Sequence, residues 1–91
     1  MNSMFRDCYE LTSIDVSNFK TENVKKMNSM FSHCSKLTSI DVSNFKTVNV
    51  ENIKFIFKDC SKLKSIDISK NNENIFKKNI NEKETILKLK L

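Results

Sequence analysis

The sequence predicts an α/β fold: a short right-handed solenoid in which each 26-residue coil contributes one helix and one short parallel strand. Residues 1–26 and 27–52 are identical at 19 of 26 positions, and a third, more diverged copy begins at Ile53. Within each copy, the spacing of apolar residues changes from that of a helix to that of a strand. A repeat of this length cannot bury its apolar face alone, so we expect neighbouring copies to stack.

The first half of each repeat is expected to form the helix. From residue 23 to residue 34 the apolar residues are three, three, one and three residues apart: Val24, Met27, Met30, Phe31 and Cys34. This spacing places them on one face of a helix of about three turns.

The second half of each repeat is expected to form the strand. Ile40 and Val42 alternate with the polar residues Ser39, Asp41 and Ser43, which is the period of a strand. Strands of successive repeats should pair in parallel and align matched apolar residues in buried columns. The expected columns are Leu11, Leu37 and Leu63; Ile14, Ile40 and Ile66; Val16, Val42 and Ile68; and Phe5, Phe31 and Phe57.

The repeats are expected to fill residues 1–71, with copies at about 1–26, 27–52 and, incomplete, 53–71. The chain opens partway through a repeat, so we expect an excerpt of a longer repeat protein. The uncapped outer coils would also allow molecules to associate end to end.

Residues 72–91 are expected to be a diverged capping segment or a frayed tail. A helix over 74–83 would lead into a closing strand over 84–91, where leucines alternate with Lys88 and Lys90. Lysines on an edge strand discourage pairing with other sheets.

Composition excludes several classes of function. The net charge is +5, but up to Ser69 ten basic residues face eight acidic ones, so we expect no binding of nucleic acid. The opening residues lack the apolar run of a signal peptide, and no stretch is long enough for membrane insertion. The sequence contains no glycine and one histidine, which excludes a glycine-rich phosphate loop and leaves no catalytic triad. We expect no enzyme activity and no cofactor.

Three cysteines occupy the same position of each repeat: Cys8, Cys34 and Cys60. None has a second ligand two to four residues away, so we expect no metal site. His33 precedes Cys34, but adjacent residues on a helix point in different directions. Buried, reduced and inert thiols are therefore expected.

The polar face of the strands is the candidate binding site. The predicted partner-binding residues are Ser13, Asp15, Ser17, Ser39, Asp41, Ser43, Ser65, Asp67 and Ser69. Carboxylates about 5 Å apart repel by about 1 kcal/mol in water, and a bound cation or basic partner would relieve that repulsion. In the alternative interpretation, each aspartate organises its own turn or pairs with a neighbouring lysine and is simply solvated.

The motif MFxxCxxLxxIDVSNF, at residues 30–45, resembles the 26-residue repeats of bacterial surface proteins, the BspA-like leucine-rich repeats. The resemblance covers about residues 1–70. It implies a curved leucine-rich-repeat-like solenoid on a cell-surface or secreted protein, such as a surface lipoprotein or adhesin, that binds a protein or other macromolecule of the host or matrix. The alternative is a truncated repeat fragment with a purely structural role and no ligand of its own.

Overall fold

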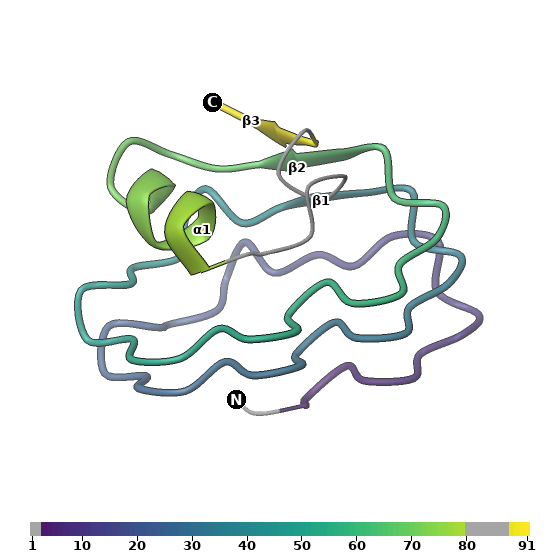
Figure 1. The fold of residues 1–91 in the computed structure, drawn as a ribbon, viewed down its shortest axis with the longest axis horizontal. Coiled ribbons are helices and arrows are strands. Elements are labelled where there is room, and N and C mark those ends of the chain that lie inside the picture. Colours follow the sequence, from purple (N-terminus) through teal and green to yellow (C-terminus); the bar gives the residue numbers. More distant parts are fainter. Residues whose placement is uncertain (1–2, 80–87) are drawn as a thin grey trace.

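Three short parallel strands and one short helix form the regular structure of the protein. The computed structural model describes residues 3–79 and 88–91. Its elements are β1 (Ser39–Asp41), β2 (Ser65–Asp67), α1 (Glu73–Asn79) and β3 (Leu89–Lys90). The strands form an open sheet in the order β1-β2-β3. Helix α1 lies toward the same end of the molecule as β2 and β3 (Figure 1).

The predicted right-handed solenoid, with one helix and one strand in every coil, is wrong. In the described part of the chain α1 is the single helix, and it follows the repeats instead of lying within each of them. Residues 23–34, which were expected to be helical, contain turns and an isolated bridge between Lys26 and Asn52. The fold is a small α/β domain built on an open three-stranded sheet.

Left-handed backbone conformations explain why the predicted helices do not form. Non-glycine residues in this conformation recur in every repeat: Ser3 (φ 55°), Asp7 (63°), Ser29 (55°), His33 (62°), Phe55 (60°) and Asp59 (58°). A right-handed helix cannot continue through such a residue. In each repeat the two left-handed residues are four positions apart, so the segment that was expected to be helical consists of successive tight turns.

The backbone hydrogen bonds of this segment follow the same alternation. The Met30 amide donates to the Met27 carbonyl three residues earlier, whereas the Phe31 amide donates to the Ile56 carbonyl of the next repeat. Turns of this kind join apolar residues three apart, such as Met27 and Met30, and both side chains are buried. This spacing imitates a helical pattern without any helix.

The strands of the second and third repeats pair with a register offset equal to the repeat period. Ser39 pairs with Ser65, and Asp41 pairs with Asp67. The matching residues of the first repeat are assigned to no strand, although the Thr38 amide donates to the Thr12 carbonyl at 3.2 Å.

A row of phenylalanine rings crosses the core. The Phe31 ring lies 5.6 Å from both Phe5 and Phe57, with interplanar angles of 4° and 7°. Matched residues of the second and third repeats are buried around this row. The buried hydrophobic residues are Val16, Met27, Met30, Phe31, Cys34, Leu37, Ile40, Val42, Phe45, Val50, Ile53, Ile56, Phe57, Cys60, Leu63, Ile66, Ile68 and Phe76.

Helix α1 supplies a ring that the third repeat lacks. In the first repeat Phe19 lies 5.9 Å from Phe5 at an interplanar angle of 28°. The third repeat has Asn71 at the position of Phe19, and Phe76 of α1 instead lies 6.2 Å from Phe57 at 28°. The helix thus completes the aromatic row where the repeat pattern stops.

The buried side chain of Asn72 ties α1 to the second repeat. Its amide nitrogen donates to the Val42 and Phe45 carbonyls at 2.9 and 3.0 Å, and its oxygen accepts from the Ser69 amide at 2.9 Å. All these bonds are buried or partly buried, where an unpaired polar group would be costly.

The predictions for residues 72–91 fall only partly on described residues. The helix expected over 74–83 corresponds to α1 as far as Asn79, and its last four positions lie outside the described residues. Of the strand expected over 84–91, β3 covers Leu89–Lys90, and positions 84–87 likewise lie outside.

Candidate functional site

Four of the nine predicted binding residues lie in paired strands. Ser39 and Asp41 flank the buried Ile40 in β1, and their partners in β2 are Ser65 and Asp67. Adjacent strands are about 4.8 Å apart, so matched side chains on one face are direct neighbours. Asp41 and Asp67 are both exposed, so this face presents two carboxylates side by side.

The first-repeat members of the predicted site lie beside β1 without forming a strand. Ser13, Asp15 and Ser17 are exposed. The Asn44 side-chain amide donates to the Val16 and Ser17 carbonyls at 3.1 and 2.9 Å, which ties this segment to the second repeat. The segment that carries Asp15 therefore lies against the second repeat.

Serine residues two positions later hold two of the carboxylates in their ionised form. The Ser43 hydroxyl and amide both donate to Oδ1 of Asp41, at 2.5 and 2.9 Å, and lower the pKa of that carboxyl. The Ser17 amide donates to Oδ1 of Asp15 at 2.9 Å and lowers its pKa in the same way. Hydrogen bonds to the charged form favour it.

The third repeat departs from this arrangement. The Ser69 amide donates to Asn72 instead of Asp67, and the Ser69 hydroxyl oxygen is buried without a hydrogen bond to any described residue. Asp67 has a different neighbour, because β3 pairs with β2 in the register Asp67 to Lys90. A lysine of the chain itself therefore lies in line with the carboxylates.

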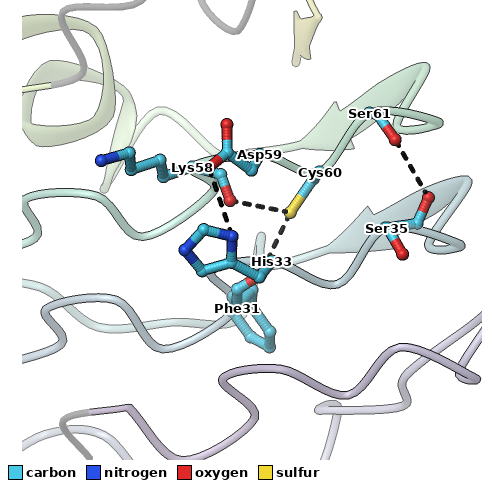
Figure 2. A network of polar contacts seen from close by, with 7 residues as sticks. All are labelled: Phe31, His33, Ser35, Lys58, Asp59, Cys60 and Ser61. Atoms are coloured by element: carbon cyan, nitrogen blue, oxygen red, sulfur yellow. Dashed lines mark hydrogen bonds and ion pairs between the residues drawn. The ribbon is translucent and has the colours of Figure 1, made fainter.

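A second polar cluster lies on the turn segments of the second and third repeats (Figure 2). His33 Nδ1 lies 3.2 Å from Oδ2 of Asp59, and both side chains are partly exposed. The Cys60 thiol donates to the Phe31 carbonyl at 3.1 Å and makes a longer contact, 4.0 Å, with the Lys58 carbonyl. The sulfur is thus directed at backbone oxygens and not at the imidazole.

The thiols of the buried cysteines are poor nucleophiles. Burial raises the pKa of Cys60 to about 12 and also raises the pKa of Cys34, whose thiol donates to the Phe5 carbonyl at 3.1 Å. Thiolate is the reactive form, so both sulfurs are protonated at neutral pH. Cys8 is half-buried, and all three cysteines are free.

Other sites are few in residues 3–79 and 88–91. No group of three or more histidine, cysteine, aspartate or glutamate side chains is arranged to hold a metal ion there. A hollow of about 340 Å³ is lined by Lys46, Thr47, Val48 and Asn71. In the part of the chain that the structure describes, no helix is long and apolar enough to cross a bilayer.

Residues 1–87 match the protein family described as "Mycoplasma protein of unknown function, DUF285". The chain belongs to this family. The repeats of this chain, at residues 1–71, lie within the range that matches the DUF285 family, which is consistent with a bacterial repeat family. No curated protein matches the chain, and no solved structure does.

Sequence reasoning missed two features of this DUF285 domain. The position of Lys90 beside Asp67 depends on how β3 returns to the sheet, which no local pattern encodes. The contact between His33 and Asp59 joins equal positions of successive repeats. The repeat alignment already contains that second signal, because residues 26 apart become neighbours.

Proposed function

We propose that this DUF285 domain is a non-enzymatic binding module whose serine and aspartate face takes a basic protein or another macromolecule carrying basic groups. The proposal rests on the alignment of Asp41 with Asp67, because two exposed carboxylates on neighbouring strands repel each other and a cation between or over them would offset that repulsion. Electrostatic complementarity of this kind favours partners of the opposite charge.

The chain itself provides an example of the contact. Lys90 occupies the register position beside Asp67, so a basic side chain already extends the acidic row at the β3 edge. A partner that places lysine or arginine over Asp15 and Asp41 would continue this arrangement along the face.

The carboxylates are charged and accessible under ordinary conditions. The lowered pKa values of Asp15 and Asp41 keep both ionised at neutral pH. Both bonds from Ser43 go to Oδ1 of Asp41, so Oδ2 makes no hydrogen bond to a described residue. That oxygen is available to a ligand.

A lysine-rich peptide tests the proposed face. Titration into the isotopically labelled protein should shift the backbone amide resonances of Ser39–Asp41 and Ser65–Asp67, and added salt should weaken the binding. The variant Asp41→Asn/Asp67→Asn should bind the peptide at least about tenfold more weakly, since it loses two charge-assisted contacts.

The matched control removes two exposed carboxylates elsewhere, in Glu22→Gln/Glu51→Gln. This variant should bind the peptide like the unmodified protein. Equal losses in both variants would show that the peptide responds only to net charge. Absence of binding to the unmodified protein would favour a purely structural role for the domain.

We further propose that the domain belongs to an exported or cell-surface protein involved in adhesion. The resemblance of residues 30–45 to BspA-like surface repeats supports this location. Protease treatment of intact cells that produce the protein should remove it, whereas a cytoplasmic marker stays intact. Protection of the protein until the cells are lysed would contradict the proposed location.

A further inference from the structure

A hollow lies between the loop that follows β1 and the segment that leads into α1. Its volume is about 340 Å³, and it is lined by Lys46, Thr47, Val48 and Asn71. Val48 is apolar and yet 87% exposed. The polar groups around this hollow carry the inference that follows, beginning with the threonine.

The matched threonine of the first repeat shows what such a side chain normally binds. The Lys46 amide donates to the Thr21 hydroxyl at 2.8 Å, and this hydroxyl donates to the Lys46 carbonyl at 3.3 Å. Thr21 thus bridges both backbone polar groups of one residue in the following repeat. Its side chain is almost completely buried there.

Thr47 occupies the matched position of the second repeat but lacks this bridge. The residue that would supply it is Asn72, which lies 26 positions after Lys46. The Asn72 amide donates to the Ser69 carbonyl at 3.2 Å, and the Asn72 carbonyl accepts from the Phe76 amide at 3.3 Å. The turn into α1 therefore uses the backbone groups that would otherwise pair with Thr47.

The Thr47 hydroxyl consequently makes no hydrogen bond to a described residue, although Thr47 is only 9% exposed. A polar group that is withdrawn from water without a partner is destabilising. Because Thr47 lines the hollow, a molecule placed in the hollow can reach its hydroxyl. An occupant of the hollow would therefore supply the missing partner.

The hollow also offers a positive charge. Among the described residues, neither Lys46 nor the adjacent Lys70 takes part in an ion pair. The Asn71 side-chain amide is exposed and can both donate and accept. Electrostatic complementarity favours an occupant that carries a carboxylate near Lys46.

We propose that this hollow binds an extended segment of an acidic peptide from another protein. The backbone of the segment bridges the Thr47 hydroxyl through one N–H and one C=O group, as Lys46 bridges Thr21. A carboxylate side chain of the segment meets the Lys46 ammonium group, and a small apolar side chain covers Val48.

A peptide suits the hollow better than a free carboxylate ion. The bridge at Thr21 needs one donor and one acceptor on the same residue, and every peptide residue except proline provides both. A carboxylate provides acceptors alone. The volume lies within the range of about 300–1,000 Å³ that is typical of ligand sites, so the hollow can hold part of one chain.

This site is independent of the serine and aspartate face. The hollow lies beyond the end of β1 and carries lysine, whereas the face carries aspartate. The two sites therefore bind partners of opposite charge. A lysine-rich peptide is not expected in the hollow.

A short peptide of alternating glutamate and alanine, capped at both ends, tests the site in the full chain. Titration should shift the backbone amide resonances of Lys46, Val48 and Asn71 and leave those of Ser39–Asp41 in place. Added salt should weaken the binding. Absence of binding, or shifts confined to other residues, would overturn the proposal.

Two further ligands test the role of the peptide backbone. The same peptide with N-methylated alanines cannot donate from those amides and should bind at least about fivefold more weakly. Free glutamate should bind far more weakly than the peptide. If glutamate binds as tightly, the hollow is a site for a small anion and the peptide proposal is wrong.

Variants of the hollow identify the groups that bind. Thr47→Val removes the hydroxyl, keeps the shape of the side chain and should weaken peptide binding at least about fivefold. Lys46→Gln should weaken it as well and remove most of its salt dependence. The control Lys20→Gln removes the matched lysine of the first repeat, which does not line the hollow, and should bind the peptide normally.

Urea unfolding shows whether the Thr47 hydroxyl is open in the free protein. Thr47→Val should leave the urea midpoint unchanged or raise it, because valine replaces an unpartnered hydroxyl. Thr21→Val should lower the midpoint, because the Lys46 amide and carbonyl lose their partner.

Equal losses in Thr47→Val and Thr21→Val would show that Thr47 is already paired and would overturn the proposal. A Thr47→Val protein that binds the acidic peptide normally would do the same. This variant should still bind the lysine-rich peptide at the aspartate face, so failure of one proposal is distinguishable from failure of the other.

Discussion

Cys60 shows how burial controls the chemistry of a single residue in this domain. Its thiol donates to the Phe31 carbonyl, and desolvation raises its pKa to about 12. The raised pKa means that the folded protein favours the protonated thiol. The repeated cysteine therefore acts as a small buried donor that links neighbouring repeats.

The pH dependence of stability follows from this shift. An unfolded thiol loses its proton with a pKa of about 8.5, so below that pH both states hold the proton and Cys60 adds no pH dependence. Between about pH 8.5 and 12 the unfolded state binds fewer protons than the folded state. The free energy of unfolding should fall with rising pH, by no more than about 1.4 kcal/mol per pH unit from this group.

Urea unfolding at pH 8, 9 and 10 measures the effect. The variant Cys60→Ala should be less stable at pH 8, because it leaves a small cavity, but its stability should fall less steeply toward pH 10. Parallel curves for the two proteins would show that Cys60 does not cause the alkaline loss.

At the scale of elements, the sequence predicts the strand of the repeat but not the turns that precede it. The alternation of Ser39, Ile40 and Asp41 predicts a strand, and β1 spans those three residues. The spacing of Met27, Met30 and Phe31 suits a helix equally well, and there the prediction is wrong. Left-handed conformations are usually marked by glycine, but this chain has none and uses serine, aspartate, histidine and phenylalanine instead.

Contacts between residues far apart in the sequence are the second feature that local sequence patterns do not predict. The outward serines and aspartates could be identified from the alternation alone, because side chains alternate across any strand. The place of Lys90 beside Asp67 and of Phe76 on Phe57 depends on the return path of the chain after the repeats. No periodicity in residues 72–91 specifies that path.

Substitution of Ser29 discriminates between the turn and a helix. Its φ of 55° is unfavourable for any residue with a Cβ and costs nothing for glycine. Ser29→Gly should therefore leave the protein as stable or more stable, whereas Ser29→Val should destabilise it by about 1–2 kcal/mol. A helix would give a different order, with glycine clearly destabilising.

Urea unfolding of both variants measures these changes. Ser32 lies in the same segment without a left-handed backbone, so Ser32→Gly should be destabilising and serves as the control. A loss of stability in Ser29→Gly as large as in Ser32→Gly would contradict the assigned turn.

At the scale of the whole molecule, side chains of the second repeat are more deeply buried than the matched side chains of the first repeat. The Phe31 amide donates to Ile56 inside a fully buried segment, whereas the Phe5 amide donates to Met30 from a half-buried residue at the end face. Less buried segments open locally at a lower free energy than buried ones, so we expect the first repeat to open before the second.

Hydrogen exchange followed by NMR should reveal this gradient. We expect the amides of Ser29 and Phe31 to exchange at least about tenfold more slowly than those of Ser3 and Phe5. The matched positions make the comparison direct, since each pair differs mainly in its place along the row. Equal protection in both repeats would mean that the domain opens only as a single unit.

The direction of the hydrogen bonds along this row has an electrostatic consequence. From Ser3 to His33, seven amides each donate to a carbonyl of the following repeat at 2.7–3.0 Å. Their peptide dipoles therefore point the same way and add up, as they do along an α-helix, without a helix being present. The Met4 and Arg6 carbonyls, at the first-repeat end of this row, accept no hydrogen bond from the described residues. The partial negative charge of the macrodipole therefore lies at that end, where its potential favours the guanidinium of Arg6.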